Sequence, residues 1–183
     1  RMGTNMARRL KDHGYRIAAV QDHHATASQS LALELDSEAA ASPARVAEIS
    51  DIIITVVSDD AAMRDIYSEV DSTSLMAHAK DRLFINCATL TPALHIDIEQ
   101  AVERRGGAAL EACMASSINQ ARQGTLYLMC GGKQNVFNRA RPLLDSLGTI
   151  VRYIGPAGEA ATIKALVNMV MNINTAGLAE GLG

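Results

Sequence analysis

Residues 41–60, ASPARVAEISDIIITVVSDD, contain the stretch that decides the fold: an unbroken run of apolar and β-branched residues that ends in a polar turn. A strand this uniformly β-branched is typical of one buried on both faces, as in a parallel sheet. We therefore expect a strand over Ile52–Val57, preceded by a short helix from about Pro43. The following residues, AAMRDIYSEV (61–70), favour another helix.

The alternation of strand and helix extends in both directions from this stretch. Expected helices lie at about 4–13, 26–42 (with a loose connection), 92–105, 135–147 and from 158 onward; expected strands lie at 15–21, 82–88, 108–114, 125–130 and 149–153. Thr91 and Pro92 are typical of a helix N-cap and first turn. The pattern predicts the α/β class, a doubly wound and mainly parallel sheet of Rossmann type. Ligands of such sheets bind beyond the carboxyl ends of the strands.

Composition and charge exclude several classes of function. The net charge is -3 and basic residues form no runs, so we expect neither nucleic acid nor a membrane as a partner. Asn168, Asn172 and Asn174 oppose a membrane-spanning reading of the apolar C-terminal segment. The three cysteines lack metal-ligand spacing and are expected to be reduced core thiols. The pair His23-His24 has no matching partner, so we expect no metal site.

The last thirty residues, IGPAGEAATIKALVNMVMNINTAGLAEGLG (154–183), combine a glycine-rich turn with a long apolar pattern. No charged residue occurs from Ala165 to Ala179, so we expect a mostly buried helix there. Lys164, Asn168 and Asn172 recur every four residues and share one face. This face is either the wall of a site or a structural arrangement in which the lysine extends its ammonium group to water.

Five segments, in this order along the chain, carry a family resemblance: RMGTNMARRL (1–10), DIIITVVSDD (51–60), NCATLTP (86–92), EACMASSINQARQGTLYLMCGG (111–132) and GPAGEAATIKALVNM (155–169). Taken in the same order, the first two resemble the end of the motif G-L-G-x-M-G-x-x-M-A and the strand and turn beside the nicotinamide. The third resembles D-x-S-T-x-x-P, and the fourth resembles D-A-P-V-S-G-G-x-x-x-A-x-x-G-T-L with the glycine pair that follows it. The fifth resembles G-x-G-x-x-x-K-x-x-N-N. These are motifs of the β-hydroxyacid dehydrogenases, which include 3-hydroxyisobutyrate and 6-phosphogluconate dehydrogenases.

The resemblance implies an oxidoreductase that moves a hydride between NAD and the hydroxyl-bearing carbon of a small β-hydroxyacid. Lys164 would be the general acid/base, because a poorly solvated lysine suits proton exchange with a hydroxyl. Asn168 would hold the lysine or the substrate. The remaining implied contacts are cofactor contacts: Met2 and Gly3 at the pyrophosphate, Asp22 at the adenosine ribose, and Val57, Ser58 and Thr89 near the nicotinamide. A carboxylate at Asp22 favours NAD over NADP.

The chain also departs from the family's motifs. Ala115, Ser116 and Ser117 stand where the family has the Ser-Gly-Gly that holds the substrate carboxylate. Either Ser116 or Ser117 could supply the missing hydroxyl, and we expect Ser116 to do so. Further departures are Ala88 for serine, Ala160 for glycine and Val167 for asparagine. An alternative therefore stays open: an NAD-binding or interaction module derived from this family, with impaired chemistry.

Compared with the family, the first strand and the all-helical second domain are missing, which suggests a fragment that is inactive alone. We expect residues 1–156 to form the dinucleotide-binding domain and 157–183 to begin the interdomain helix. Loss of the first strand would leave two inner sheet edges unpaired. The first residue is Arg1, so the true N-terminus is expected to be missing. The full-length protein is expected to be a homo-oligomer in the cytoplasm, or in the mitochondrial matrix if a transit peptide is missing.

Overall fold

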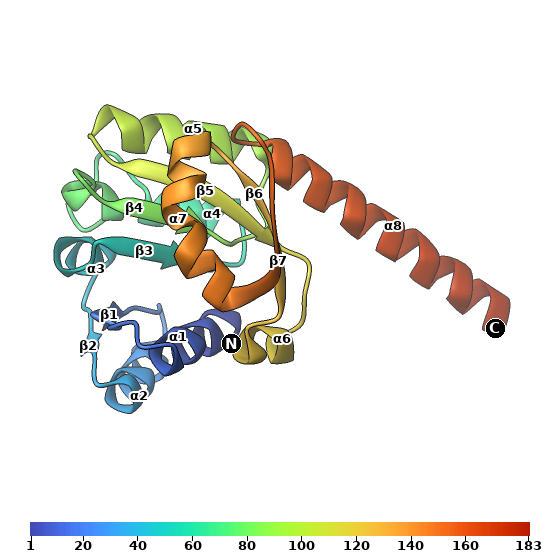
Figure 1. Cartoon of the computed structure of the whole chain (residues 1–183), viewed down its shortest axis with the longest axis horizontal. Helices are drawn as coiled ribbons and strands as arrows, with labels where there is room; N and C mark the ends of the chain where they lie inside the picture. The colour runs from blue at the N-terminus through green and yellow to red at the C-terminus, as the bar shows by residue number, and fades with distance from the viewer.

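The computed structural model describes residues 1–183 and has a five-stranded sheet at its centre (Figure 1). The strands lie in the order β3 (Ile52–Thr55), β4 (Leu83–Asn86), β5 (Ala108–Met114), β6 (Leu126–Gly131) and β7 (Gly148–Gly155). All neighbouring strands are parallel except β5 and β6, which are antiparallel. The mainly parallel α/β fold expected from the alternating pattern is confirmed.

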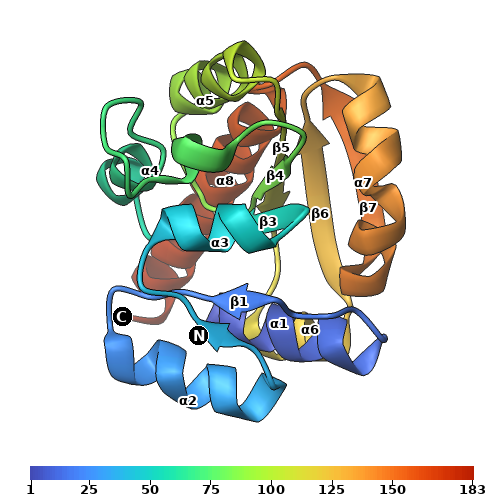
Figure 2. The same ribbon diagram turned by 90° about the vertical axis from the view of Figure 1, so that its left-hand side faces the viewer.

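A second, two-stranded parallel sheet lies apart from the first and consists of β1 (Ala19–Val20) and β2 (Glu38–Ala39). Figure 2 shows β1 below β3 in the view, without a strand between them. β1 pairs only with β2, and β3 pairs only with β4. The expectation of two unpaired inner edges is therefore confirmed, and β3 is an edge strand rather than one enclosed by neighbours.

The helices surround both sheets, and several begin with the capping residues that their sequences favour. They are α1 (Met2–Asp12), α2 (Ala25–Leu35), α3 (Pro43–Ile49), α4 (Asp60–Ile66), α5 (Pro92–Arg104), α6 (Ile118–Gln123), α7 (Gln134–Leu147) and α8 (Glu159–Leu182), with a 3-10 turn at Leu75–His78. Ser42 caps α3 and Asp59 caps α4 through side-chain oxygens. Thr91 occupies the N-cap position of α5, but its hydroxyl donates instead to Asp60 at 2.6 Å.

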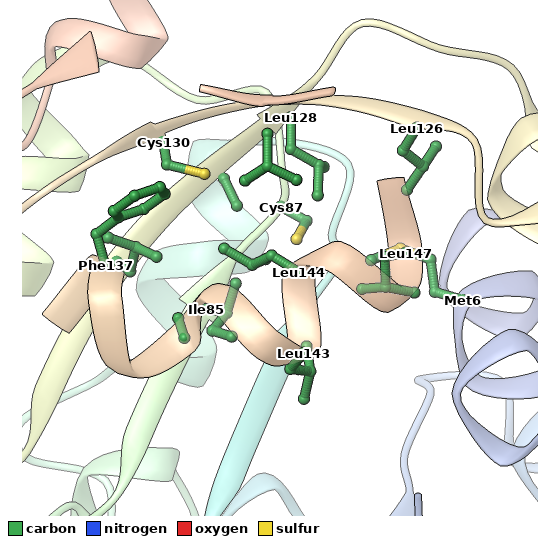
Figure 3. Close-up of a cluster of buried hydrophobic side chains, with 14 of the residues drawn as sticks. Met6, Ile85, Cys87, Leu126, Leu128, Cys130, Phe137, Leu143, Leu144 and Leu147 are labelled. Atoms are coloured by element: carbon green, nitrogen blue, oxygen red, sulfur yellow. The ribbon is translucent and has the colours of Figure 1, made fainter. Parts of the chain in front are cut away.

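The hydrophobic core lies on both faces of the five-stranded sheet. On one face Leu144 of α7 lies towards Leu128 of β6, and Leu147 of α7 lies beside Met6 of α1 at the end of the cluster (Figure 3). The other face is covered by a second cluster, with Phe84 from β4, Met63 from α4, and Leu94, Ile98 and Val102 from α5. The two faces explain why β4 is buried along its whole length.

All three cysteines are buried and free, as expected for core thiols. Burial raises the pKa of Cys113 and of Cys130 to about 12. Burial also raises the pKa of Cys87. A thiol in such surroundings stays protonated and unreactive near neutral pH.

Some local expectations were wrong. β1 and β3 are shorter than expected, β2 and α6 were not anticipated, and β6 runs against β5. The largest difference concerns α8, which extends away from the sheet (Figure 1) and buries only Ala160 and Ala161. From Met169 onward the helix is exposed, because no other element packs against it there. No helix combines the length and hydrophobicity needed to cross a membrane.

Candidate functional site

The loops that follow β3, β4 and β5 lie on the same side of the sheet, at the carboxyl ends of these strands. Thr55, Asn86 and Glu111 are neighbours in register, so the chain leaves these parallel strands on the same side. Val57 is half-buried after β3, while Ser58 and Thr89 are exposed after β3 and β4. This side of the sheet therefore brings together the three residues expected near a nicotinamide.

A buried hydrogen-bond network ties the ends of β3 and β4 together beneath these loops. The side-chain oxygen of Asn86 accepts from the Thr55 hydroxyl at 2.8 Å and from the Tyr67 hydroxyl at 2.7 Å. All three residues are buried, and Asn86 is the acceptor that both hydroxyls share. The network fixes the ends of β3 and β4, from which the loops with Val57 and Thr89 begin.

The N-terminus of α1 lies beside the end of β3. A Cβ added to Gly3 would lie 3.5 Å from the Cβ of Val56, which places the first turn of α1 against this strand end. No side chain caps α1, and no acidic residue occupies its first turn. The backbone N–H groups of Met2 and Gly3 therefore have the free donors and the electrostatic setting that suit an anionic group such as a pyrophosphate.

Asp22 lies just beyond β1, on the smaller sheet. Its carboxylate accepts a hydrogen bond from the backbone N–H of His24 at 2.9 Å and lies 3.2 Å from Nδ1 of His23. The side chain remains exposed. Its position after a strand, at the carboxyl end, matches the position expected for a ribose contact.

The loop after β5 contains Ala115, Ser116 and Ser117. The hydroxyl oxygen of Ser116 accepts from the backbone N–H of Tyr127 at 2.8 Å, which joins the loop to β6. Ser117 is the N-cap of α6 and forms a capping box with Gln120. Each serine hydroxyl acts as an acceptor in these bonds, so each keeps its proton for donation to another group.

Lys164 and Asn168 lie one turn apart on α8, and both are half-buried; Asn172, on the same face, is exposed. The buried start of α8 packs with Cys113 and Met129, close to the end of β5. The Lys164 ammonium lowers the pKa of the Cys113 thiol against the larger effect of burial, so its charge lies near the end of β5. Lys164 and the loop after β5 are thus on the same part of the sheet.

Sequence reasoning missed a buried cluster of Glu111, Cys113 and His95 behind this site. One Glu111 oxygen, Oε1, accepts from the backbone N–H groups of Gly158 and Ala160, each at 2.9 Å. Its other oxygen, Oε2, lies 3.6 Å from Nδ1 of His95. One side-chain N, O or S atom from each of the three residues lies within 4.8 Å of the others. A glutamate inside the apolar strand AALEACM was the available signal.

Burial controls the ionisation of this cluster. It raises the pKa of Glu111 to about 7, although the N–H bonds from Ala160 and Gly158 act in the opposite direction. It lowers the pKa of His95 to about 4. His95 is therefore neutral at pH 7, and the contact between the two residues is not a full ion pair.

The chain is similar to proteins of a known family. Residues 1–155 match the family described as the NAD binding domain of 6-phosphogluconate dehydrogenase. The mitochondrial 3-hydroxyisobutyrate dehydrogenase of Rattus norvegicus is 32% identical over 181 residues, which cover 99% of this chain and 53% of that protein. The chain thus spans about half the length of this curated relative.

Solved structures agree with these matches. The Mycobacterium tuberculosis 3-hydroxyisobutyrate dehydrogenase with L-serine has a TM-score of 0.87 and 25% identity, over 98% of this chain and 60% of that one. An imine reductase from Myxococcus stipitatus in complex with NAD+ has a TM-score of 0.88 over 99% of this chain and 61% of that one, and at 20% identity it shows the fold alone. The chain belongs to the family of NAD binding domains of 6-phosphogluconate dehydrogenase.

Proposed function

We propose that the full-length protein is an NAD-dependent dehydrogenase that oxidises the hydroxyl-bearing carbon of a small β-hydroxyacid, with Lys164 as the general acid/base. The observation that carries the proposal is the position of Lys164, half-buried on α8 close to the end of β5. The family match over residues 1–155 supports the cofactor class, and the 3-hydroxyisobutyrate dehydrogenases among the relatives support the substrate class.

The proposed cofactor contacts follow the edge of the sheet. The free N–H groups at the start of α1, from Met2 and Gly3, bind the pyrophosphate, and Asp22 accepts hydrogen bonds from the ribose hydroxyls. Val57, Ser58 and Thr89 lie beside the nicotinamide. When bound, NAD+ supplies the hydride acceptor. A carboxylate at Asp22 repels the 2′-phosphate of NADP, so we propose NAD as the preferred cofactor.

In the proposed reaction Lys164 first loses a proton to water, which leaves a neutral amine as the base. Its Nζ then accepts the proton of the substrate hydroxyl, while the electron pair of the carbon–hydrogen bond leaves as hydride and the carbon–oxygen double bond forms. Ser116 donates to the substrate carboxylate, and Asn168 holds the lysine or the substrate. General acid/base catalysis of this kind typically contributes about 10²–10⁴-fold to the rate.

We also propose that the chain contains one domain and the start of a second. Residues 1–156 form the dinucleotide-binding domain, and 157–183 begin a helix that leads into a second domain. The exposed apolar side chains of α8, such as Met169, Val170 and Ile173, agree with this role, because they have no partner among residues 1–183. We also propose that the full-length protein forms a homo-oligomer.

The experiment is Lys164→Met in full-length protein, assayed with a panel of small hydroxyacids. Methionine keeps most of the aliphatic stem but cannot transfer a proton. We expect a folded variant that binds NAD with unchanged Kd and has lost at least about 10²-fold in kcat. Lys80→Met is the matched control, since Lys80 is exposed and precedes β4, at the opposite edge of the sheet. A near-normal kcat for Lys164→Met would refute the role of Lys164.

A further inference from the structure

Glu111 and Gly131 are directly opposite each other in the antiparallel pair β5–β6. A Cβ on Gly131 would overlap Oε1 of Glu111 and would also come within 2.9 Å of the carbonyl oxygen of Pro156. The glycine therefore leaves the space through which the Glu111 side chain crosses β6 towards the start of α8. Gly131 lies where the register between β6 and β7 shifts, but its φ is outside the left-handed region, so the space that it leaves for Glu111 is its specific contribution to the packing.

The Glu111 side chain ends at the N-terminus of α8 and caps it from another element. α8 has no side-chain cap of its own; its N-cap is Gly158, in the left-handed region at φ 92°. Two of its first backbone N–H groups, from Gly158 and Ala160, donate to Glu111. An oxygen acceptor at this place satisfies donors that would otherwise be buried without partners, and a negative charge there is favoured by the helix dipole.

The bonds from Glu111 are important for the position of α8, because most of this helix makes few contacts with the rest of the protein. Only Ala160 and Ala161 are buried, and the helix extends from them without support from another element beyond its first turns. Lys164 follows these anchored residues by about one turn, or roughly 6 Å along the axis. A change in the anchor therefore tilts or shifts the helix and moves Nζ of Lys164 relative to the end of β5.

We propose that Glu111 is a positioning residue for Lys164: through its bonds to the first turn of α8, it holds the lysine at the end of β5. Nδ1 of His95, from α5, contacts the other carboxylate oxygen, Oε2. This inference rests on the proposed function, because it assumes that the position of Lys164 determines turnover. A displacement of only about 1 Å in a catalytic group can cost on the order of 10²-fold in rate.

Three substitutions of Glu111 in full-length protein test the inference. Glu111→Ala removes the acceptor, and we expect kcat to fall about 10- to 100-fold while the Kd for NAD changes less than about twofold. Glu111→Asp keeps a carboxylate but withdraws it by about 1.5 Å, and we expect an intermediate loss of kcat. Glu111→Gln keeps an oxygen for both N–H groups, so it should restore kcat to within about threefold of wild type.

Folding and positioning are separated by measuring kcat on protein whose folded fraction is known from circular dichroism. A merely structural role predicts a lower Tm with unchanged kcat per folded molecule in all three variants, and that outcome would overturn the inference. If Glu111→Ala does not fold, Glu111→Asp decides. Adding Lys164→Met to a Glu111 variant should cause a smaller loss than it does in the wild type, because the lysine is already misplaced.

The same series distinguishes this inference from the proposed function. If Lys164→Met keeps a normal kcat, the proposed function fails, and the positioning role fails with it. If Lys164→Met loses turnover while folded Glu111→Ala and Glu111→Asp keep the wild-type kcat, only the positioning role fails. Loss of kcat in Glu111→Gln equal to that in Glu111→Ala would also overturn it, because the acceptor is then not the feature that matters.

Discussion

The hydroxyl of Ser116 holds the loop after β5 against β6 by accepting the backbone N–H of Tyr127 at 2.8 Å. The proton of this hydroxyl is not used in that bond, so it is available to a ligand beside the loop. Ser117, the next residue, has its hydroxyl oxygen in the capping box of α6 instead. Ser116 and Ser117 thus make different hydrogen bonds, and single substitutions can distinguish their roles.

For Ser116→Ala in full-length protein, we expect KM for the hydroxyacid to rise by about 10- to 100-fold, since a hydrogen bond to a charged group is worth about 1.5–3 kcal/mol. Ser117→Ala is the matched control. It should instead lower the free energy of unfolding by about 1 kcal/mol through loss of the cap, with little change in KM. Steady-state kinetics and urea denaturation measure the two effects, and a larger KM effect in Ser117→Ala would contradict the assignment.

Asp22→Asn should weaken the preference for NAD. Asparagine keeps the side-chain oxygen that accepts from His24 but removes the negative charge facing a 2′-phosphate. Removing such a repulsion at an exposed site is worth about 1–2 kcal/mol, so the ratio of kcat/KM for NADP to that for NAD should rise about tenfold. Asp36→Asn is the control, because Asp36 is an exposed aspartate at the other end of α2. An unchanged ratio in Asp22→Asn would remove Asp22 from cofactor selection.

The buried Glu111 should affect stability in a pH-dependent way. Its pKa of about 7 in the folded protein lies above the ordinary value of 4.5, so the protonated form is favoured by folding. The contribution of Glu111 is fully present below pH 4.5 and is lost as pH rises to about 7. Relative to Glu111→Gln, the wild type should therefore lose stability across this range, by on the order of 3 kcal/mol.

Urea denaturation at several pH values, performed on wild type and Glu111→Gln, measures this difference. Comparing the two proteins cancels the titrating groups that lie away from Glu111. His95 contacts Glu111, and its own contribution runs the other way with pH, because its lowered pKa gives a stability that is lost as pH falls from 6.5 to about 4. A constant difference between pH 4.5 and 7 would show that Glu111 keeps an ordinary pKa in the folded protein.

The network beneath the candidate site should be sensitive to its shared acceptor. Asn86→Ala removes the acceptor that the buried hydroxyls of Thr55 and Tyr67 share, and we expect a loss of about 2–4 kcal/mol in the free energy of unfolding. Tyr67→Phe removes one donor while Asn86 keeps Thr55, so the loss should be only about 1 kcal/mol. Chemical denaturation distinguishes the two, and equal losses would contradict the dependence on Asn86.

The alternating pattern was sufficient to predict the fold class, because buried strands and long amphipathic helices carry strong signals. β5 was predicted to the residue, and α7 to within one residue at its start. Short elements such as β2 and α6 were missed because two to six residues contain too little periodicity. The antiparallel direction of β6 was also missed, since strand direction depends on connections rather than on the residues of the strand itself.

Local motifs led to the proposal of Lys164, Gly3 and Thr89 as site residues. Glu111 was not recognised, because its role depends on three segments that are distant in sequence: β5, Gly131 in β6 and the first turn of α8. The burial of α8 was overestimated for a related reason. An uncharged helix requires a partner surface, but composition does not show which residues provide that surface.

The separation of the two sheets has a consequence for how the chain opens. β1 and β2 share only short pairing, such as the bond from the Ala40 N–H to the Val20 carbonyl, and their connection to the rest depends mainly on α1 packing against α6 and α7. The small sheet of β1 and β2 should therefore open as a separate cooperative unit, with a low free energy of opening. In hydrogen-exchange experiments on residues 1–183, the amides of Glu38 and Ala40 should exchange well before those of β4, whose residues are wholly buried.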